Sequence, residues 1–209
     1  MQNKTYKGKV NMLASIGIVG HGFVGGAMSK SFLENNIDVK IYDKYKNIGS
    51  IDDLLCCNAI FLCLPTLFKD KAGFDKGAIY EVCDELERLD YSGCVLIKST
   101  VEPGTSETLS KKYSFEIFHN PEFLSAATAY EDFHNQKHIV LGSTSKLSNN
   151  YNFDFINKFY SSYYPEAKIS VCSSNESESM KLFCNNFYAM KIMIFNEFFD
   201  LCQKKSIDF

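Results

Sequence analysis

One segment near the N-terminus restricts the folds open to this chain more than any other. It begins with an apolar run at residues 16–19 and breaks into the sequence GHGFVG at residues 20–25. Apolar residues at helical spacing follow, and a second apolar run at residues 39–42 ends on Asp43. A strand, a glycine-rich turn, a helix and a second strand in this order predict the first βαβ unit of a parallel sheet.

The glycines of this segment have the positions that a dinucleotide-binding turn requires. Gly20 permits a sharp turn out of the strand, and Gly22 lets a pyrophosphate approach the backbone without a side chain in the way. Gly25 lets the helix pack closely against the sheet. The first residues of the helix, Phe23 and Val24 included, present backbone amides and the positive end of the helix dipole to the phosphates. The segment therefore predicts a dinucleotide-binding site.

The acidic residue at the end of the second strand selects between the two nicotinamide dinucleotides. Asp43 is placed to accept hydrogen bonds from both hydroxyls of the adenosine ribose, and its charge repels a 2′-phosphate. NAD is therefore favoured over NADP, although Lys44 and Lys46 nearby weaken that preference. His21 is expected to line the turn rather than to take part in chemistry.

After Asp43 the pattern alternates between short apolar runs and amphipathic segments. Further strands are expected at residues 60–64, 95–97, 115–118, 138–141 and 167–171. Helices are expected at residues 51–55, 77–89, 105–112 and around 153–160. Repeated β–α units with short connections predict an α/β fold, a doubly wound Rossmann-type parallel sheet with helices on both faces. In this interpretation residues 1–13 form an N-terminal tail and residues 14–174 the nucleotide-binding domain.

Residues 175–209 are expected to form a long helix that begins a central, dimerisation domain. Asn175 and Glu178 have the spacing of an N-terminal capping box. An apolar stripe at helical spacing follows: Met180, Phe183, Cys184, Phe187, Met190, Ile194, Phe198 and Leu201. About 30 residues at a rise of 1.5 Å give a helix of roughly 45 Å, longer than one domain is wide. Because no later sequence covers this stripe, we expect a homodimer through the helix.

The composition bears on the possible partners, the location of the protein and the presence of disulfides or metal sites. A net charge of −3 and a pI near 5.8 argue against a nucleic-acid partner, and the apolar runs are too short to cross a membrane. Eight cysteines, mostly in apolar runs and without a C-x-x-C pair, predict reduced thiols in a cytoplasmic protein. His134 and His138 lack a nearby third ligand, so no metal site is expected.

Five stretches that together cover most of the chain carry a more specific signal. They are GIVGHGFVG at residues 17–25, FLCLPT at 61–66, IKSTVEPGT at 97–105, HNPEFLSAATAYEDFHNQKHIVLG at 119–142 and ESMKLFCNNFYAMKIMIFNE at 178–197. In order and spacing they resemble the UDP-glucose/GDP-mannose dehydrogenases, which oxidise the C6 alcohol of a nucleotide sugar to a carboxylate with two molecules of NAD. The resemblance implies NAD as cofactor and a nucleotide-sugar substrate, in a reaction of the type UDP-glucose to UDP-glucuronate.

The resemblance also implies where the nicotinamide half of the cofactor lies. Pro65 and Thr66 would close over it, with Ser99 and Thr100 beside them, and Thr100 and Glu122 would flank the reacting centre. The residues themselves agree with this placement. Thr100 and Glu122 each follow a predicted strand, where a doubly wound sheet binds its ligands.

The remaining roles, by the same resemblance, fall on the residues after Glu122 and on the long helix. Glu122 would position or deprotonate a water, and Phe123 and Leu124 would contact the nucleotide sugar. Lys181 and Asn185 would hold the oxyanion that develops at C6.

The spacing of the helix residues is compatible with these roles. Glu178, Lys181 and Asn185 are at positions i, i+3 and i+7, which places them on one face of the helix. A solvated Glu178–Lys181 pair on a surface helix is the alternative explanation of the same spacing.

One part of the family pattern is missing. The family captures its aldehyde with a cysteine in a GFGGSCFPKD stretch beyond the long helix, and neither that stretch nor the C-terminal sugar-nucleotide domain occurs here. Cys184 is nearest the proposed site but lacks those surroundings. Taken alone, the chain is expected to bind NAD and to lack covalent aldehyde capture. The N-terminal part of a longer enzyme, a split subunit and a degenerate copy all fit the sequence.

Two other functions stay open. A β-hydroxyacid dehydrogenase resembles this chain in its glycine turn, in the end of its LCLPT-like strand and in its helix Lys-x-x-x-Asn, but STVEPGT and NPEFL argue against it. A non-catalytic NAD-binding or assembly module would use the long helix as a dimerisation surface.

Overall fold

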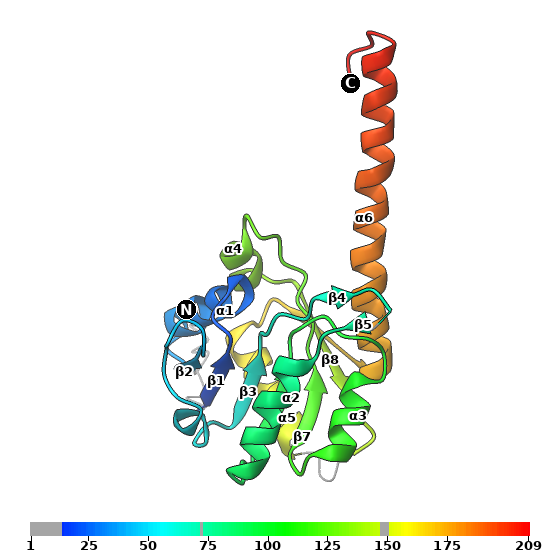
Figure 1. The fold of residues 1–209 in the computed structure, drawn as a ribbon. Helices are drawn as coiled ribbons and strands as arrows, with labels where there is room; N and C mark the ends of the chain where they lie inside the picture. Colours follow the sequence, from blue (N-terminus) through cyan, green and yellow to red (C-terminus); the bar gives the residue numbers. More distant parts are fainter. Residues whose placement is uncertain (1–13, 72, 147–150) are drawn as a thin grey trace, which may run out of the picture.

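A seven-stranded sheet with helices on both faces forms the body of the structure, a computed structural model that describes residues 14–71, 73–146 and 151–209 (Figure 1). The strands of the sheet are β1 (Ser15–Val19), β2 (Asp38–Tyr42), β3 (Ala59–Leu62), β6 (Cys94–Ile97), β7 (Glu116–His119), β8 (His138–Ser143) and β9 (Lys168–Ser173). The helices are α1 (Phe23–Glu34), α2 (Gly77–Arg88), α3 (Thr105–Lys112), α4 (Ala129–His134), α5 (Tyr151–Tyr163) and α6 (Ser174–Lys204), with a 3-10 turn at Asp52–Leu54. A separate small hairpin pairs β4 (Phe68–Lys69) with β5 (Gly73–Phe74). The predicted tail at residues 1–13 lies outside the described residues.

The strand order is β2-β1-β3-β6-β7-β8-β9, so the chain moves outward in both directions from β1. This confirms the predicted doubly wound, Rossmann-type sheet. One junction differs from the expected parallel pattern, because β7 and β8 pair antiparallel. The segment between these two strands contains only the six-residue helix α4, which packs against α1 rather than crossing the sheet. Strand β8 therefore enters the sheet in the opposite direction.

Alternating side chains along the central strands divide the core into two layers. In β3, Phe61 packs on one face with the aromatic rings of Phe32 and Phe159. Ile60 and Leu62 point to the other face and pack with apolar residues of α2 and α3. All four residues of β3 are buried. A continuous apolar run of this kind is what a strand covered on both faces requires, which is why the sequence pattern located it.

Helix α6 begins one residue earlier than predicted, and a different pair of residues caps it. The Ser173 hydroxyl accepts a hydrogen bond from the Glu176 amide at 3.3 Å, and the Glu176 carboxylate accepts one from the Ser173 amide at 2.8 Å. The predicted capping box of Asn175 and Glu178 is wrong. Both pairs have the required spacing, but Glu178 is fully buried and its carboxylate binds amides at the N-terminus of α3.

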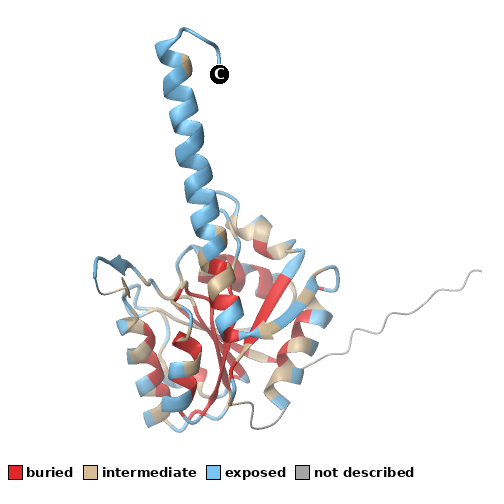
Figure 2. Ribbon diagram, turned by 90° about the vertical axis from the view of Figure 1, so that its right-hand side faces the viewer, coloured by how far each residue is buried: buried red, intermediate tan, exposed pale blue. Residues whose placement is uncertain are grey.

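Most of α6 projects away from the sheet (Figures 1 and 2). Its apolar side chains are exposed over most of its length: Phe183, Phe187, Met190, Ile192, Met193, Ile194, Phe195, Phe198, Phe199 and Leu201. The predicted stripe thus has no cover within the described chain, and a homodimer through α6 stays a prediction. None of the helices in the described ranges combines the length and the apolar character needed to cross a membrane.

His119, the last residue of β7, is buried beneath the start of α6. Its Nδ1 atom lies 2.7 Å from the hydroxyl oxygen of Ser177. Burial, with a smaller contribution from the positive charge of Lys98, lowers the pKa of His119 from 6.5 to about 3. The unfolded state therefore binds one more proton than the native state between these two pH values, and stability must fall as the pH falls through this window.

We expect the wild-type chain to lose more stability on acidification than a His119→Asn variant. The difference should approach about 1.4 kcal/mol per pH unit within the window, because only the wild-type unfolded state gains this proton. Chemical denaturation between pH 7 and pH 4 measures both proteins. The other three histidines are common to both and cancel. If the free energy of unfolding depended on pH in the same way for both proteins, the prediction would be contradicted.

Candidate cofactor and substrate site

At two positions in the turn between β1 and α1, only glycine fits. Gly20 has a φ of +88°, and a Cβ atom there would lie 2.4 Å from the carbonyl oxygen of Cys63. A Cβ atom at Gly25 would lie 1.9 Å from the carbonyl oxygen of Gly20. Both distances are far below van der Waals contact. These glycines therefore allow β1, β3 and α1 to approach one another.

Gly22, unlike Gly20 and Gly25, is not required by packing within the protein. A Cβ atom there would meet no protein atom within 4 Å. The residue is the N-cap of α1, and no side chain caps the helix. The following side chains, exposed Phe23 and half-buried Val24, leave the first-turn amides without a side-chain acceptor. An uncapped helix N-terminus beside a position that lacks Cβ fits the diphosphate of a dinucleotide.

Asp43 lies beside this turn, as the sequence predicted. Its carboxylate accepts hydrogen bonds from the backbone amides of His21 at 2.8 Å, Tyr45 at 3.0 Å and Lys46 at 2.9 Å. Partial burial opposes ionisation, but the three amide hydrogen bonds outweigh it and lower the pKa of Asp43. Asp43 is thus ionised at neutral pH, and a carboxylate has further lone pairs for ribose hydroxyls.

The two lysines that weakened the preference for NAD both have other partners. The Lys44 ammonium lies 2.5 Å from the Glu81 carboxylate, and the Lys46 ammonium donates to the carbonyl of His21. The imidazole of His21 is 3.0 Å from the hydroxyl of Ser29. This contact agrees with the prediction that His21 lines the turn.

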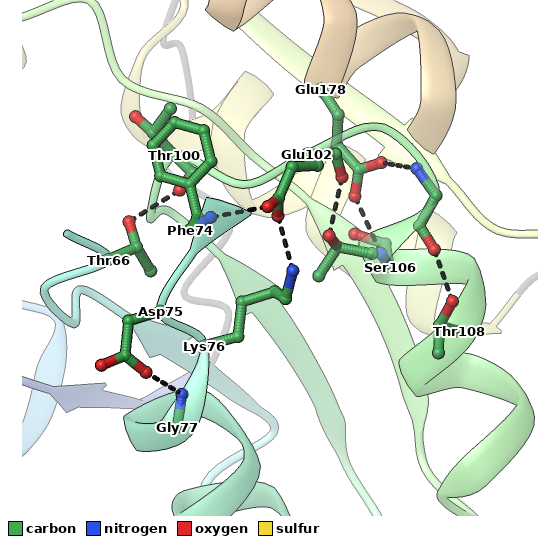
Figure 3. A network of polar contacts seen from close by, with 12 residues as sticks. Thr66, Phe74, Asp75, Lys76, Gly77, Thr100, Glu102, Ser106, Thr108 and Glu178 are labelled. Atoms are coloured by element: carbon green, nitrogen blue, oxygen red, sulfur yellow. Dashed lines mark hydrogen bonds and ion pairs between the residues drawn. The ribbon is translucent and has the colours of Figure 1, made fainter. Parts of the chain in front are cut away.

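The second group of predicted cofactor residues lies where β3 and β6 end. The Thr66 hydroxyl donates to the Thr100 carbonyl at 2.6 Å (Figure 3). The hydroxyl of buried Ser99 donates to the Leu64 carbonyl at 2.7 Å and accepts from the Leu64 amide at 3.0 Å. Ser99 therefore supports the loop that carries Pro65 and Thr66, and Pro65 is exposed at this edge of the sheet.

The structure brings Glu122 and Lys181 together from positions 59 residues apart. The Lys181 ammonium donates to the Glu122 carbonyl at 2.5 Å and to its carboxylate at 2.9 Å. The other carboxylate oxygen of Glu122 accepts from the Leu124 amide at 2.7 Å. Lys181 is only 5% exposed, and its ammonium lies 5.3 Å from the centre of the Phe123 ring. A solvated surface pair of Glu178 and Lys181 is therefore excluded.

A cavity of about 660 Å³ adjoins this pair. Five of the predicted site residues line it: Glu122, Phe123, Leu124, Lys181 and Asn185. Thr100 does not line it and lies with the cofactor residues at the strand ends. The predicted residues thus form two groups, one at the carboxyl ends of the central strands and one between the 121–125 segment and the base of α6.

Lys98 also lines this cavity and was not among the predicted site residues. Its ammonium, 3% exposed, donates to the side-chain oxygen of Asn120 at 3.2 Å and to the Pro121 carbonyl at 3.3 Å. Burial lowers the pKa of Lys98 to about 8. A lysine directly after the apolar run CVLI was the available signal, because a lysine at the end of a buried strand needs a polar partner.

Metal ligands and disulfides contribute nothing further to the described site. No group of three or more histidine, cysteine or acidic residues in the described ranges could hold a metal ion. His138 lines the cavity, whereas the imidazole of His134 is 3.0 Å from the hydroxyl of Ser31. All eight cysteines are free, and Cys184 lines the cavity.

Comparison with known proteins points to one family. Residues 50–163, more than half of the chain, match the NAD-binding domain of the UDP-glucose/GDP-mannose dehydrogenase family. The UDP-glucose 6-dehydrogenase of Rickettsia felis is 33% identical over 168 residues, which are 77% of this chain and 36% of that protein. The chain spans little more than a third of the length of this and similar curated relatives.

Solved structures share the fold. A UDP-glucose dehydrogenase from Pyrobaculum islandicum superimposes with a TM-score of 0.83 at 22% identity, over 99% of this chain and 56% of that chain. A 3-hydroxyisobutyrate dehydrogenase from Mycobacterium tuberculosis gives a TM-score of 0.72 at 13% identity, over 94% of this chain and 67% of that chain. The fold is therefore common to a nucleotide-sugar dehydrogenase and to a dehydrogenase of a small hydroxy acid.

Proposed function

Because the chain belongs to the UDP-glucose/GDP-mannose dehydrogenase family and NAD is its cofactor, we propose that it forms the cofactor side of a nucleotide-sugar 6-dehydrogenase site. The observation that carries this proposal is the largely buried Glu122–Lys181 pair at the cavity. A fold shared with other dehydrogenases does not require these two residues to meet. Their contact supports chemistry at this position.

In the proposed mechanism, the β1–α1 turn and Asp43 would hold NAD, which would supply the acceptor for the hydride from C6 of the sugar. Glu122 takes up the hydroxyl proton, directly or through a water. Lys181 has three N–H donors and uses two of them on Glu122, so one stays available to the C6 oxygen. The Asn185 amide, which also lines the cavity, donates to the same oxygen. Fixed donors in a partly buried site stabilise a developing negative charge.

The second oxidation requires capture of the aldehyde, and no cysteine of this chain has the surroundings expected for it. We therefore propose that turnover needs a cysteine-bearing segment or subunit in addition to residues 1–209. Phe123 and Leu124 would contact the sugar, and Thr66 and Thr100 the nicotinamide half. We further propose a cytoplasmic enzyme.

A non-catalytic NAD-binding or assembly module is the second candidate. In this candidate the exposed apolar side chains of α6 would be the main functional surface and would pair with a second copy of the chain. Both candidates include a homodimer through α6, which sedimentation at micromolar concentrations would detect.

An activity assay separates the candidates. We expect the chain to bind NAD in calorimetry, with NADP at least about tenfold weaker because Asp43 is ionised. We expect NADH formation, followed by absorbance, from UDP-glucose or GDP-mannose after a cysteine-bearing domain of a relative is added. Binding without turnover in every combination would support the assembly module. Turnover of a small 3-hydroxy acid alone would support the β-hydroxyacid class, and absence of NAD binding would contradict all three.

A further inference from the structure

Two carboxylates connect the turn at residues 102–106 to other elements: Glu178 reaches the turn from α6, and Glu102 reaches from the turn to the segment before α2 (Figure 3). This turn connects β6 to α3 and follows Thr100. The Glu178 carboxylate of α6 accepts hydrogen bonds from the amides of Gly104 at 2.7 Å and Ser106 at 2.8 Å. Gly104 is the N-cap of α3 and has no side chain to cap it, so Glu178 supplies the cap from another helix. This contact fixes the base of α6 against the turn.

Glu102 reaches toward the segment that leads into α2. Its carboxylate accepts a hydrogen bond from the Phe74 amide at 2.6 Å and forms an ion pair with Lys76, also at 2.6 Å. Burial opposes ionisation of Glu102, but these two contacts outweigh it and lower its pKa. The carboxylate is therefore charged at neutral pH and engaged at both oxygens.

Gly73 lies beside the contact between Glu102 and Phe74, and its lack of a side chain leaves room for that contact. A Cβ atom at Gly73 would lie 2.3 Å from a Glu102 carboxylate oxygen, and Gly73 has a φ of +75°. A larger residue would be strained there and would displace the carboxylate. The chain thus lets the Glu102 carboxylate lie directly against the backbone of β5.

These contacts attach both ends of the loop between β3 and α2 to the segment 100–102. The Thr66 hydroxyl holds the first end through the Thr100 carbonyl, and Glu102 holds the second end through Phe74 and Lys76. Glu178 attaches the same turn to α6, three residues before Lys181. The turn therefore lies between the residues proposed to contact the nicotinamide and the residues proposed to act on the substrate.

We propose that Glu102 is a positioning residue that fixes Thr66 and Thr100 in the arrangement that receives the nicotinamide end of NAD. This inference rests on the proposed placement of those two threonines. It assigns Glu102 no contact with the adenosine half, which binds at the β1–α1 turn and Asp43.

Two ligands distinguish positioning of the nicotinamide end from a general structural role. ADP-ribose contains the adenosine half and the diphosphate but no nicotinamide. In Glu102→Ala we expect calorimetry to show NAD affinity reduced by about fivefold and ADP-ribose affinity unchanged. We also expect the fluorescence of bound NADH, which reports the surroundings of its nicotinamide, to move toward that of free NADH. Lys76→Met, which removes only the ion pair, should give a smaller change in the same direction.

Glu107→Ala is the matched control. Its carboxylate also accepts two hydrogen bonds, from the amide and hydroxyl of Ser145, but these join α3 to Ser145 and not to the loop between β3 and α2. We expect this variant to bind both ligands as the wild type does. Equal losses of NAD and ADP-ribose in Glu102→Ala, or no change in NAD affinity and NADH fluorescence, would overturn the proposal. A wild-type chain that fails to bind NAD would instead overturn the proposed function.

Discussion

Replacement of Gly22 by alanine should remove most of the affinity for NAD and leave the fold intact. The new methyl group would meet no protein atom within 4 Å, and the backbone at residue 22, with φ −83° and ψ −151°, is open to alanine. The destabilisation should stay below about 1 kcal/mol, the scale of a poorer N-cap. The same methyl group would occupy the approach to the helix amides, so we expect NAD affinity to fall by about tenfold or more.

The neighbouring glycines provide the controls. Gly25→Ala places Cβ 1.9 Å from a backbone oxygen, which cannot rotate away as a side chain could, so we expect a loss of roughly 3 kcal/mol or more. Gly26→Ala, inside α1, would place its Cβ atom 4.0 Å from the His21 side chain, so it should be neutral or slightly stabilising and should keep NAD affinity. Thermal unfolding and calorimetry on the three variants test this. A Gly22→Ala chain that binds NAD normally would place the diphosphate elsewhere.

The sequence alone predicts those parts of the fold that depend on residues close together in the chain. Buried parallel strands appear as continuous apolar runs, and the β1–α1 turn requires glycine at positions where a Cβ atom would clash. Thus β3, β6 and the turn were located closely. The direction of β8 was missed because it depends on whether the connecting segment crosses the sheet, and residues 120–137 carry no local signal of that.

The parts that were missed depend on contacts between distant residues. Glu178 matched a local capping pattern, but its actual partners are amides 74 and 72 residues away. Ser173 caps the helix instead, because it lies at the end of β9 where the backbone is still extended. Lys98 was not among the predicted site residues, and only the folded chain shows that it shares a cavity with Glu122 and Lys181.

Replacement of Lys181 by methionine should destabilise the chain by about 3 kcal/mol. The substitution keeps most of the apolar stem but leaves both the carbonyl and one carboxylate oxygen of Glu122 without their ammonium partner. Loss of one member of a buried ion pair costs about 3–5 kcal/mol, and the lower value is expected because the Glu122 side chain keeps 16% exposure to water. Chemical denaturation at neutral pH measures the effect.

Lys191→Met, at an exposed position of the same helix, should change stability by less than about 0.5 kcal/mol and serves as the matched control. In a Glu122→Gln background the Lys181→Met substitution should cost less, since a neutral amide needs the ammonium less than a carboxylate does. NAD affinity should be retained in Lys181→Met, because the ion pair lies outside the β1–α1 turn. Equal effects of the two lysine substitutions would mean that the Glu122–Lys181 contact contributes little in solution, and the proposed catalytic pair would lose its main support.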